Sequence, residues 1–482
     1  MCDGNMTLHT DKYQINMMYS HWVNGSHNDK AVFDVYFRKL PFGNGFAVFA
    51  GLQRIADYIR SLSFGDAEIA YLREQEENYR EDFLEELRRF QFTANVHAVP
   101  EGTLVFPNEP IMRIEGRIFE VQLIETAVLN YMNYQTLIAT KAARIKRVAG
   151  DDMLLEFGSR RAQEADAAVW GARAAYIAGF DATSNMLAGM RFGIPTKGTH
   201  AHAWVQGHAT EQEAFDHYAA ALPDQVTLLV DTYDTLASGV PHAIRTAKKL
   251  EQQGKRMNAI RLDSGDLALL SKKAREMLDQ AGLPYVKIVA SNDLDETLIF
   301  NLKGQGARID TWGVGTQLIT GGSEPALGGV YKLVARQAGD GYEPVIKISG
   351  NPEKITTPGL KELYRIINRQ TGKAEADYIT LREETDVREG KRIKLFDPLH
   401  PYLHKYMDDY EAIPLLQPVF AGGELVARLP QLDEIRAYHR RQLELFLPEQ
   451  LRKLNPEVYP VDLSETAWQL KMNLLHQYSK RQ

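Results

Sequence analysis

The sequence predicts an α/β protein whose middle third forms a β/α barrel or another parallel α/β fold, flanked by segments with sheets of their own. Its length of 482 residues is too great for one ordinary compact core, so two or three domains are expected. In the middle third, short apolar runs end in small or polar residues, and most are followed by helical stretches. Strand-like runs return after this third, and two helices follow them.

The first third predicts a mixture of strands and helices. Residues 31–37 and 46–51 are apolar runs separated by a glycine-containing turn, which is typical of two strands. Residues 68–90 form a strongly amphipathic helical stretch. Residues 95–116 alternate apolar and polar side chains between prolines and glycines, which favours a small antiparallel sheet. Residues 119–149 contain no helix breaker and predict one long helix or two abutting ones.

The middle third repeats a strand followed by a helix. Apolar runs that end in polar residues occupy 153–161, 226–234, 259–266 and 286–294, and a glycine-rich run follows at 309–322. In β/α barrels the reactive residues lie at the C-terminal ends of the strands. The polar residues that end these runs are therefore the first candidates for a functional site.

The last part of the chain mixes short strand-like runs with two helices, expected at roughly 432–453 and 464–479. Its start indicates a return to a sheet-containing domain. The sequence shows no internal repeat, low-complexity tract or linker.

Composition and charge exclude several classes of protein. Hydrophobic residues make up 44% and charged residues 25%, which are the proportions of a soluble globular protein. The net charge of −7 argues against nonspecific binding of nucleic acid but is compatible with a local anion pocket. No signal peptide or membrane-spanning stretch is evident. Cys2 is the only cysteine, which excludes a disulfide framework and a cysteine-based zinc site and fits the reducing cytoplasm.

Arginines, carboxylates and glycine-rich turns gather where the strands of the middle third are expected to end. Arginine binds carboxylates or phosphates with a two-pronged fork, carboxylates hold Mg²⁺, and glycine-rich turns expose N–H groups to a phosphate. The set therefore indicates a phosphorylated substrate with Mg²⁺. The sequence lacks a P-loop, a strand-linked Rossmann fingerprint and a G-x-S-x-G motif. The residues are Arg160, Arg161, His200, His202, Asp231, Asp234, Arg261, Asp263, Ser264, Asp266, Ser291, Asn292, Asp293, Gly313, Gly315, Thr316, Gly321, Gly322 and Ser323.

The stretch GTHAHAW, residues 198–204, places two histidines two positions apart. In a strand both would point to the same side and could grip one metal, as in amidohydrolase-type barrels, but the later strand ends offer no further histidine. Either ring could instead pack in the core. A third possibility is that one histidine accepts a phosphoryl group, which requires ATP nearby. The residues alone leave all three alternatives open for His200 and His202.

A series of short motifs resembles the successive blocks of the nicotinate phosphoribosyltransferase family over most of the chain. The resemblance implies that nicotinate and phosphoribosyl pyrophosphate give nicotinate mononucleotide and pyrophosphate, with coupled ATP hydrolysis through a phosphohistidine, in the salvage of nicotinate into NAD. It also implies Mg²⁺, ATP as a co-substrate and no tightly bound organic cofactor. The motifs are TDKYQ (10–14), FGSRRAQ (157–163), GTHAHAW (198–204), VDTYDT (230–235), IRLDSGDL (260–267), VASNDLDE (289–296), WGVGTQLIT (312–320), GGVYKLV (328–334) and KISGNPEKITTPGLKELYR (347–365).

The same resemblance implies an irregular β/α barrel plus an α/β sandwich domain formed from the N-terminal and post-barrel segments, with C-terminal helices. The sandwich would comprise residues 1–135 and 330–430, the barrel with the active site 136–329, and the C-terminal helical segment 431–482. A cytoplasmic homodimer with active sites at the subunit interface is expected. Its partners would be the small-molecule substrates, and neither nucleic acid nor a membrane.

The resemblance also assigns roles to individual residues. His202 would be the phosphoacceptor, whereas His200 falls on a variable position of that motif. Ala203 stands where the family usually has serine, which removes a possible hydroxyl contact beside His202. The catalytic residues would be His202, Asp231 and Asp263, and Asp263 and Asp266 would hold Mg²⁺. The nicotinate contacts would be Tyr13 (from a partner subunit), Arg160, Thr199 and Arg261. The ribose and phosphate contacts would be Asp231, Ser264, Gly265, Gly315, Thr316, Gly321 and Gly322.

Three other functions remain alternatives. The first is an enzyme that uses nicotinamide, because phosphate rather than a substrate carboxylate could occupy Arg160 or Arg261. The second is a metal-dependent amidohydrolase built on the histidine pair. The third is a catalytically inactive protein that senses phosphoribosyl pyrophosphate.

Overall fold

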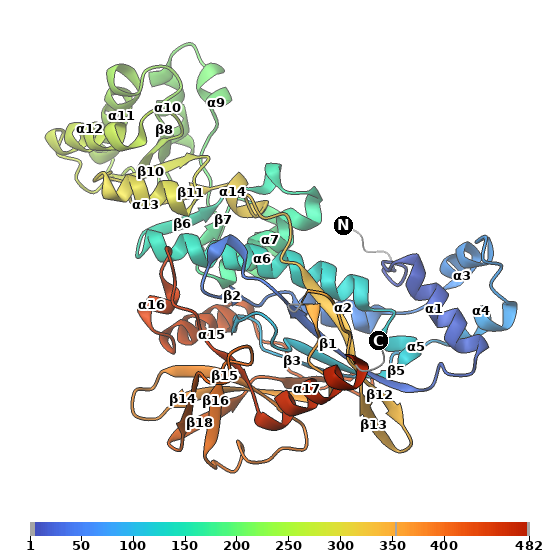
Figure 1. Cartoon of the computed structure of the whole chain (residues 1–482). Coiled ribbons are helices and arrows are strands. Elements are labelled where there is room, and N and C mark those ends of the chain that lie inside the picture. The colour runs from blue at the N-terminus through green and yellow to red at the C-terminus, as the bar shows by residue number, and fades with distance from the viewer. Residues whose placement is uncertain (1–4, 352–353, 480–482) are drawn as a thin grey trace. The chain divides into compact units, whose positions relative to one another are not determined.

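The computed structural model describes residues 5–351 and 354–479, and the chain folds as two compact units (Figure 1). Unit 1 joins Met1–Thr140 to Ala326–Gln482, and unit 2 is the continuous segment Lys141–Pro325. Cys2 lies outside the described residues. Within the described ranges, no helix combines the length and the apolar character that a bilayer crossing requires.

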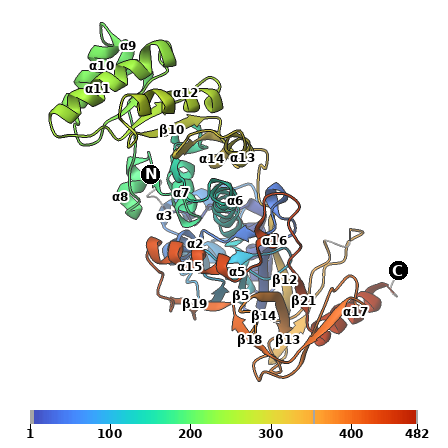
Figure 2. The same ribbon diagram turned by 90° about the vertical axis from the view of Figure 1, so that its left-hand side faces the viewer.

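Unit 2 is built on a parallel sheet of six strands in the order β7, β6, β11, β10, β9, β8. Helices join the strands because a tight turn cannot connect parallel neighbours, and Figure 2 shows α10, α11 and α12 grouped together. The predicted mixed α/β class with a parallel sheet is confirmed. The strands are β6 Met153–Glu156, β7 Ala182–Thr183, β8 Thr227–Leu229, β9 Ala259–Leu262, β10 Lys287–Asn292 and β11 Thr311–Val314. The helical segments are η2 Ser159–Arg161, α7 Glu164–Ile177, α8 Met186–Phe192, α9 His202–Gln206, α10 Glu211–Ala221, η3 Thr235–Gly239, α11 Val240–Gln252, α12 Leu267–Gln280, α13 Glu296–Gly304 and α14 Thr316–Ile319.

A further extended segment lies against β7, at one edge of this sheet. The Thr183 N–H donates to the Pro195 carbonyl and the Lys197 N–H donates to the Thr183 carbonyl, both at 3.0 Å. Thr183 and Thr196 therefore pair in parallel. Among the residues that the structure describes, no backbone ladder joins this segment to β8 at the opposite edge.

Unit 1 contains a seven-stranded sheet whose strands come from both ends of the chain, in the order β13, β12, β1, β5, β3, β19, β20. Strand β1 pairs antiparallel with β12 on one side and with β5 on the other, and β3 pairs with β19. The expected sheet domain made from N-terminal and post-barrel segments is thus present. The strands are β1 Lys30–Phe37, β3 Asn95–Ala98, β5 Met112–Arg117, β12 Gly329–Ala338, β13 Gly341–Pro344, β19 Gln417–Ala421 and β20 Glu424–Leu425.

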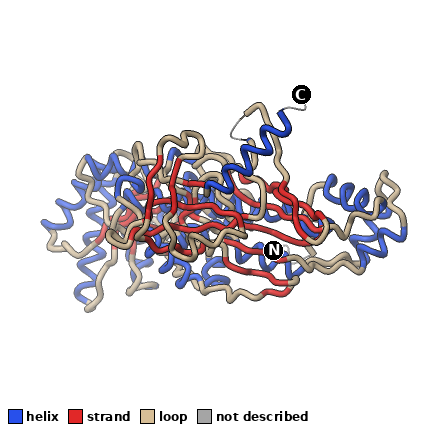
Figure 3. The backbone as a smooth tube through the Cα atoms, turned by 60° about the horizontal axis from the view of Figure 1, so that its bottom comes forward, coloured by secondary structure: helices blue, strands red, loops and turns tan. Residues whose placement is uncertain are grey.

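Three smaller sheets and the remaining helices complete unit 1. A four-stranded sheet has the order β18, β14, β15, β21, and two strand pairs are β16–β17 and β2–β4. Figure 3 shows α17 as the helix beside the C-terminal mark. The strands are β2 Ala47–Val48, β4 Leu104–Val105, β14 Lys361–Asn368, β15 Ala374–Leu381, β16 Ile393–Phe396, β17 His404–Met407, β18 Tyr410–Pro414 and β21 Val461–Leu463. The helices are α1 Lys12–Val23, η1 Pro41–Gly43, α2 Leu52–Ser61, α3 Asp66–Arg73, α4 Glu81–Arg88, α5 Ile118–Val121, α6 Glu125–Ala149 (which continues into unit 2), α15 Leu432–Glu444, α16 Pro448–Leu451 and α17 Glu465–Ser479.

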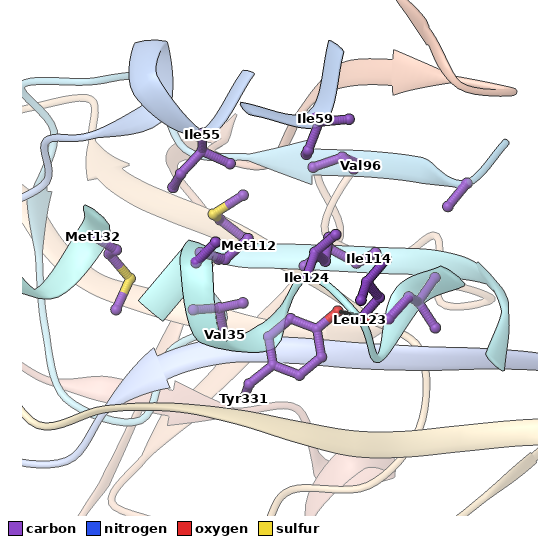
Figure 4. Packing of buried hydrophobic residues seen from close by; sticks show 14 of the residues in the cluster. Val35, Ile55, Ile59, Val96, Met112, Ile114, Leu123, Ile124, Met132 and Tyr331 are labelled. Carbon is purple, nitrogen blue, oxygen red and sulfur yellow. Dashed lines mark hydrogen bonds between the residues drawn. The ribbon is translucent and has the colours of Figure 1, made fainter. Parts of the chain in front are cut away.

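The core of unit 1 forms where the larger sheet meets its covering helices. Met112 and Ile114 are two positions apart on β5, so both side chains leave the same face of the strand. Ile55 and Ile59 are four positions apart on α2 and share one face of that helix. These four side chains and Tyr331 of β12 belong to one buried cluster (Figure 4). Removing this apolar surface from water is what favours the arrangement.

The structure decides one open alternative and changes other expected elements in detail, among them the helix expected at 432–453, which is divided into α15 and α16. Residues 119–149 form two abutting helices, α5 and α6, which was one of the two alternatives. The amphipathic stretch 68–90 contains two helices, α3 and α4, and the turn between them includes Asn78 with φ 51°. Asparagine tolerates this left-handed conformation better than most residues. The strand expected at 46–51 is limited to the two residues of β2.

Asp462 predicts a pH-dependent stability for unit 1. The residue is 4% exposed in β21, and burial together with the carboxylate of Asp397 raises its pKa from 3.8 to about 7. A carboxyl group with a raised pKa stabilises the fold below its unfolded pKa, and this contribution is lost as the pH rises through its folded pKa. We therefore expect the free energy of unfolding to fall between about pH 4 and pH 7.

The variant Asp462→Asn tests this expectation. The substitution should remove the decrease of the free energy of unfolding between about pH 4 and pH 7. It should also raise the free energy of unfolding at pH 8 by on the order of 1–2 kcal/mol, because no buried carboxylate then forms. Urea unfolding at several pH values measures the effect, with Asp409→Asn on the exposed surface as the control. If the free energy of unfolding of Asp462→Asn still falls with pH as in the wild type, Asp462 is not the cause of the pH dependence.

Candidate active site

The C-terminal ends of the parallel strands in unit 2 bring together most of the polar residues singled out in the sequence. Leu229 of β8 lies opposite Arg261 of β9, which lies opposite Val289 of β10. Asn292 at the end of β10 lies opposite Val314 of β11. Because all these strands run in the same direction, the residues that follow them lie along one edge of the sheet. The candidate site is therefore formed by the loops after β6, β8, β9, β10 and β11.

Arg261 is the centre of a hydrogen-bond network at this edge. Its Nη1 donates to the Thr199 hydroxyl at 3.0 Å, its Nε to the Ser291 hydroxyl at 2.7 Å, and its Nη2 to the Asp263 carboxylate at 3.0 Å. The Ser291 hydroxyl donates in turn to Asp263 at 2.5 Å. The Arg261 side chain is only 16% exposed, and these partners set the orientation of its guanidinium group. Two residues expected to contact nicotinate, Thr199 and Arg261, are thus in direct contact.

Asp231 follows β8 and connects it with the loop after β9. One carboxylate oxygen, Oδ2, accepts the Asp263 N–H at 2.8 Å and the Ser264 hydroxyl at 2.7 Å. The other oxygen, Oδ1, is buried and accepts no hydrogen bond from the described residues. A buried carboxylate oxygen without a partner is costly, and a hydroxyl group or a cation would satisfy it.

His202 begins α9, and both of its ring nitrogens face candidate site residues. Nδ1 lies 3.1 Å from the hydroxyl of Thr232, to which it is hydrogen bonded, and Nε2 lies 3.8 Å from the carboxylate of Asp263. The side chain is 40% exposed. His202 is therefore oriented within the site and accessible from it, as a phosphoacceptor must be.

His200 points elsewhere. Its Nε2 accepts the N–H of Leu229 in β8 at 3.2 Å, and the residue is 7% exposed. The lone pair of His200 Nε2 therefore accepts a backbone hydrogen bond, whereas the ring of His202 is hydrogen bonded to Thr232. The two rings do not converge on one metal position. No set of three metal-ligating side chains was found in the described parts of the chain. The ring contacts contradict the metal-gripping alternative and favour unequal roles for the two histidines.

Thr232 was not singled out from the sequence, and its contact with His202 predicts a measurable role. Thr232→Val keeps the side-chain shape but removes the hydroxyl group that orients the imidazole. With His202 as the phosphoacceptor that the family resemblance implies, we expect a roughly fivefold to tenfold lower rate of its phosphorylation, consistent with the loss of about 1 kcal/mol from one hydrogen bond. Transfer of ³²P from ATP to the protein measures this rate. Thr227→Val, in the preceding strand β8 and outside the site, is the control, and equal rates in both variants would contradict the role.

The glycine-rich turns after β11 leave little room for a side chain. A Cβ atom on Gly315 would lie 3.2 Å from the Phe157 carbonyl oxygen. Gly322 has φ +60°, and a Cβ atom there would lie 3.5 Å from Lys141 Nζ. The Lys141 ammonium group, which pairs with Glu296 at 2.7 Å, therefore lies against this turn. The Gly321 N–H donates to the Leu318 carbonyl at 3.1 Å and the Gly322 N–H to the Thr320 hydroxyl at 3.3 Å, so at this turn the ammonium group is the feature that favours a phosphate.

The other expected site residues lie in the same loops or in unit 1. Gly265 follows Ser264 with φ +78°, and Asp266 caps α12 by accepting the Leu269 N–H at 3.0 Å. Arg160 is exposed in η2. Tyr13 belongs to unit 1, where it is 47% exposed on α1. Thr316 is the first residue of α14, and Gly321 follows that helix with φ +74°.

Glu156 is a further site residue that the sequence prediction missed. It ends β6, is 1% exposed, accepts the Thr183 hydroxyl at 2.6 Å and also accepts the Gly158 N–H. Burial raises the pKa of this carboxyl group. It fixes the start of the loop that carries Arg160. The only signal in the sequence is an acidic residue at the end of the apolar run MLLE.

Comparisons with known proteins cover nearly the whole chain. Three family models match: the nicotinate phosphoribosyltransferase N-terminal domain over residues 8–133, the nicotinate phosphoribosyltransferase family over 153–361, and the nicotinate phosphoribosyltransferase C-terminal domain over 360–471. The nicotinate phosphoribosyltransferase of Bacillus subtilis is 54% identical over 481 residues, covering 99% of this chain and 97% of the relative. Nicotinate phosphoribosyltransferase 2 of Arabidopsis thaliana is 37% identical, covering 95% and 92%.

Two solved structures support the fold. The crystal structure of human nicotinic acid phosphoribosyltransferase matches with a TM-score of 0.85 and 31% identity, covering 96% of this chain and 99% of the human one. Nicotinate-nucleotide pyrophosphorylase from Pyrococcus furiosus matches with a TM-score of 0.70 at 24% identity, covering 92% and 97%, which supports the fold alone.

Proposed function

The chain belongs to the nicotinate phosphoribosyltransferase family, and we propose that it makes nicotinate mononucleotide and pyrophosphate from nicotinate and phosphoribosyl pyrophosphate in NAD biosynthesis. It is an enzyme of the phosphoribosyltransferase class. The observation that carries the proposal is the network around Arg261, which holds a guanidinium group and the Thr199 hydroxyl together at the strand ends. In the reaction, the pyridine nitrogen bonds to ribose C1 and the bond from C1 to pyrophosphate breaks, with the electron pair leaving on pyrophosphate.

Arg261 and Thr199 would bind the nicotinate carboxylate. A guanidinium fork suits a carboxylate, and the hydroxyl group adds a neighbouring polar contact. Arg160 would contribute from the loop after β6, and Tyr13 would stack on the pyridine ring from a partner subunit. The exposure of Tyr13 on α1 is compatible with a contribution to another protomer. Holding both reactants in one orientation accounts for part of the rate enhancement of such a site.

The aspartates and glycine-rich turns would bind the ribose and the phosphates. The unpartnered Oδ1 of Asp231 suits a ribose hydroxyl or a cation. Asp263 and Asp266 would hold Mg²⁺ together with oxygens of the pyrophosphate, a ligand set that suits this cation. When bound, Mg²⁺ neutralises the charge that develops on the pyrophosphate. The remaining ribose and phosphate contacts would be Ser264, Gly265, Gly315, Thr316, Gly321 and Gly322.

His202 would couple the reaction to ATP. A ring nitrogen of His202 takes the γ-phosphoryl group as the bond to ADP breaks, and water later removes the phosphoryl group as inorganic phosphate. By analogy with other phosphorylated side chains, the modification adds about −1.5 to −2 charges beside the site. The added charge would strengthen the binding of Mg²⁺ with the substrate, and its removal would release the products.

The active protein is proposed to be a cytoplasmic homodimer with a site at each subunit interface. The barrel segment 136–329 would carry the catalytic residues, and the sandwich segments 1–135 and 330–430 would supply Tyr13 to the neighbouring subunit. The helical segment 431–482 is the third part of the proposed division of the chain into domains. Small-molecule substrates are the proposed partners, without nucleic acid or a membrane.

A product assay tests the proposed function. We expect the protein to release pyrophosphate and form nicotinate mononucleotide from nicotinate, faster with ATP and Mg²⁺ than without ATP. Nicotinamide, which lacks the carboxylate of nicotinate, is the matched control substrate and is offered at the same concentration. A higher kcat/KM for nicotinamide, or binding of phosphoribosyl pyrophosphate without turnover, would overturn the proposal.

A further inference from the structure

The outer edge of β8 carries a buried backbone amide that no neighbouring strand satisfies. The Val230 N–H donates to the Arg261 carbonyl of β9 at 3.1 Å, and consecutive amides of a strand point to opposite sides. The Leu229 N–H therefore faces away from β9. Leu229 is 1% exposed, so its amide needs a partner other than water.

The imidazole of His200 supplies this partner. Its Nε2 accepts the Leu229 N–H at 3.2 Å, which requires a neutral ring with its proton on Nδ1. The Nδ1–H then donates to the Ala201 carbonyl at 3.3 Å. Burial, together with the charges of Arg261 and His202, lowers the pKa of His200 to about 4, so the ring is neutral at physiological pH. One tautomer satisfies both contacts.

Aromatic side chains of α10 hold the ring in this orientation. Tyr218 meets the imidazole edge-on, with ring centroids 4.9 Å apart, and Phe215 lies 6.1 Å away. Phe215 is fully buried. The ring is therefore wedged between α10 and the edge of β8 and is less free to turn than the half-exposed ring of His202.

The contact of His200 joins two parts of the candidate site. The segment before α9 pairs with β7 through Thr196 and then carries Thr199 and His202, whereas β8 leads directly into Asp231 and Thr232. The imidazole occupies the place on β8 where the carbonyl group of a neighbouring strand would otherwise accept a hydrogen bond. It thus links the two edges of the six-stranded sheet that no backbone ladder joins in the described residues.

We propose that His200 is a positioning residue: its imidazole fastens the segment that carries Thr199 and His202 to β8, and so holds the phosphoacceptor against Thr232 and Asp263. The proposal rests on the proposed function and deepens it. His200 contacts no reacting atom. It acts through the backbone of Leu229, three residues before Thr232 in the chain.

The test compares His200→Phe with His200→Gln. Phenylalanine fills the site but offers no acceptor, whereas glutamine can place its Oε1 near the position of the imidazole Nε2 and accept the same N–H. His217→Phe and His217→Gln, at an exposed histidine on α10, are the matched controls. Three quantities are measured: hydrogen exchange of the segment 226–232, the rate of ³²P transfer from ATP to the protein, and kcat and KM for nucleotide formation.

We expect His200→Phe to exchange the Leu229 amide at least tenfold faster and to phosphorylate His202 about tenfold more slowly, as the loss of one buried hydrogen bond suggests. The ATP-coupled kcat should fall in the same proportion, with KM for phosphoribosyl pyrophosphate nearly unchanged. His200→Gln should restore each quantity to within about threefold, and the His217 variants should resemble the wild type.

Wild-type phosphorylation in His200→Phe, or a failure of His200→Gln to restore it, would overturn the positioning role. If His200→Phe does not fold, His200→Ala replaces it, because alanine also removes the acceptor of the Leu229 N–H without adding volume and should show the same losses relative to His200→Gln. The two proposals fail differently. A wild-type protein that forms no nicotinate mononucleotide refutes the proposed function, whereas an active wild type with unaffected His200 variants refutes only the positioning role.

Discussion

Replacing His202 with alanine is expected to abolish phosphorylation of the protein and to remove the stimulation of nucleotide formation by ATP. His202 faces Thr232 with one ring nitrogen and Asp263 with the other, and its side chain is open to the site. A phosphoryl group there would lie close to the Mg²⁺ and pyrophosphate. Charges about 4 Å apart interact by roughly 1 kcal/mol in water and roughly 4 kcal/mol near a protein surface, so the loss should lower the ATP-coupled kcat/KM by roughly 5- to 900-fold.

The activity that His202→Ala retains also tests the role of His202. The variant should retain the slower reaction that the wild type shows without ATP, because the contacts of Arg261 and Asp231 do not pass through the imidazole. His208→Ala is the control, since its ring contacts Trp204 instead of the site. Phosphoprotein at wild-type level in His202→Ala would show that another residue is the phosphoacceptor.

Much of the site could be predicted because parallel strands impose a simple geometry. Apolar runs that end in polar residues predicted the strands, and the C-terminal ends of parallel neighbours share an edge. Asp231, Arg261 and Asp263 therefore came together as expected. Their chemical types already indicated an anionic substrate. The family resemblance then assigned individual roles that composition and periodicity alone had left open.

The contacts that orient those residues depend on three-dimensional register, which the sequence pattern does not contain. Thr232 is an ordinary polar residue after a strand, and Ser291 is one candidate among many, until the fold places them beside His202 and Arg261. Lys141 lies on α6, far along the chain from the glycine turn that its ammonium group approaches. The distinct role of His200 likewise needed the direction of the Leu229 amide, which only the pairing of β8 with β9 defines.

The larger sheet of unit 1 also could not be predicted from the sequence pattern, because the pattern does not show which strands are neighbours. Strand β1 was expected from its apolar run, but its partner β12 lies about 300 residues later in the chain. Hydrophobic alternation identifies which face of a strand is buried and does not identify its neighbours. Only the resemblance to a known family indicated that the N-terminal and post-barrel segments form one domain.

Replacing Arg261 is expected to separate recognition of nicotinate from recognition of the phosphates. Arg261→Ala removes a largely buried guanidinium group and leaves Asp263 without its ion-pair partner. Breaking a buried, hydrogen-bonded charge pair typically costs about 2–5 kcal/mol, which corresponds to a roughly 30- to 5000-fold lower kcat/KM for nicotinate. Arg261→Lys should lie between wild type and alanine, because an ammonium group keeps the charge but cannot reach Thr199, Asp263 and Ser291 in one planar fork.

The pattern of the kinetic constants decides which anion Arg261 binds. If it binds the carboxylate, KM for nicotinate rises steeply in both variants, KM for phosphoribosyl pyrophosphate changes by less than about threefold, and the preference for nicotinate over nicotinamide falls. A selective rise in KM for phosphoribosyl pyrophosphate would instead assign Arg261 to a phosphate. Arg245→Ala, at an exposed arginine of α11, controls for the loss of a positive charge. Thermal unfolding of each variant separates lost binding from lost folding, because Asp263 also accepts hydrogen bonds from Ser291 and stays partly satisfied without Arg261.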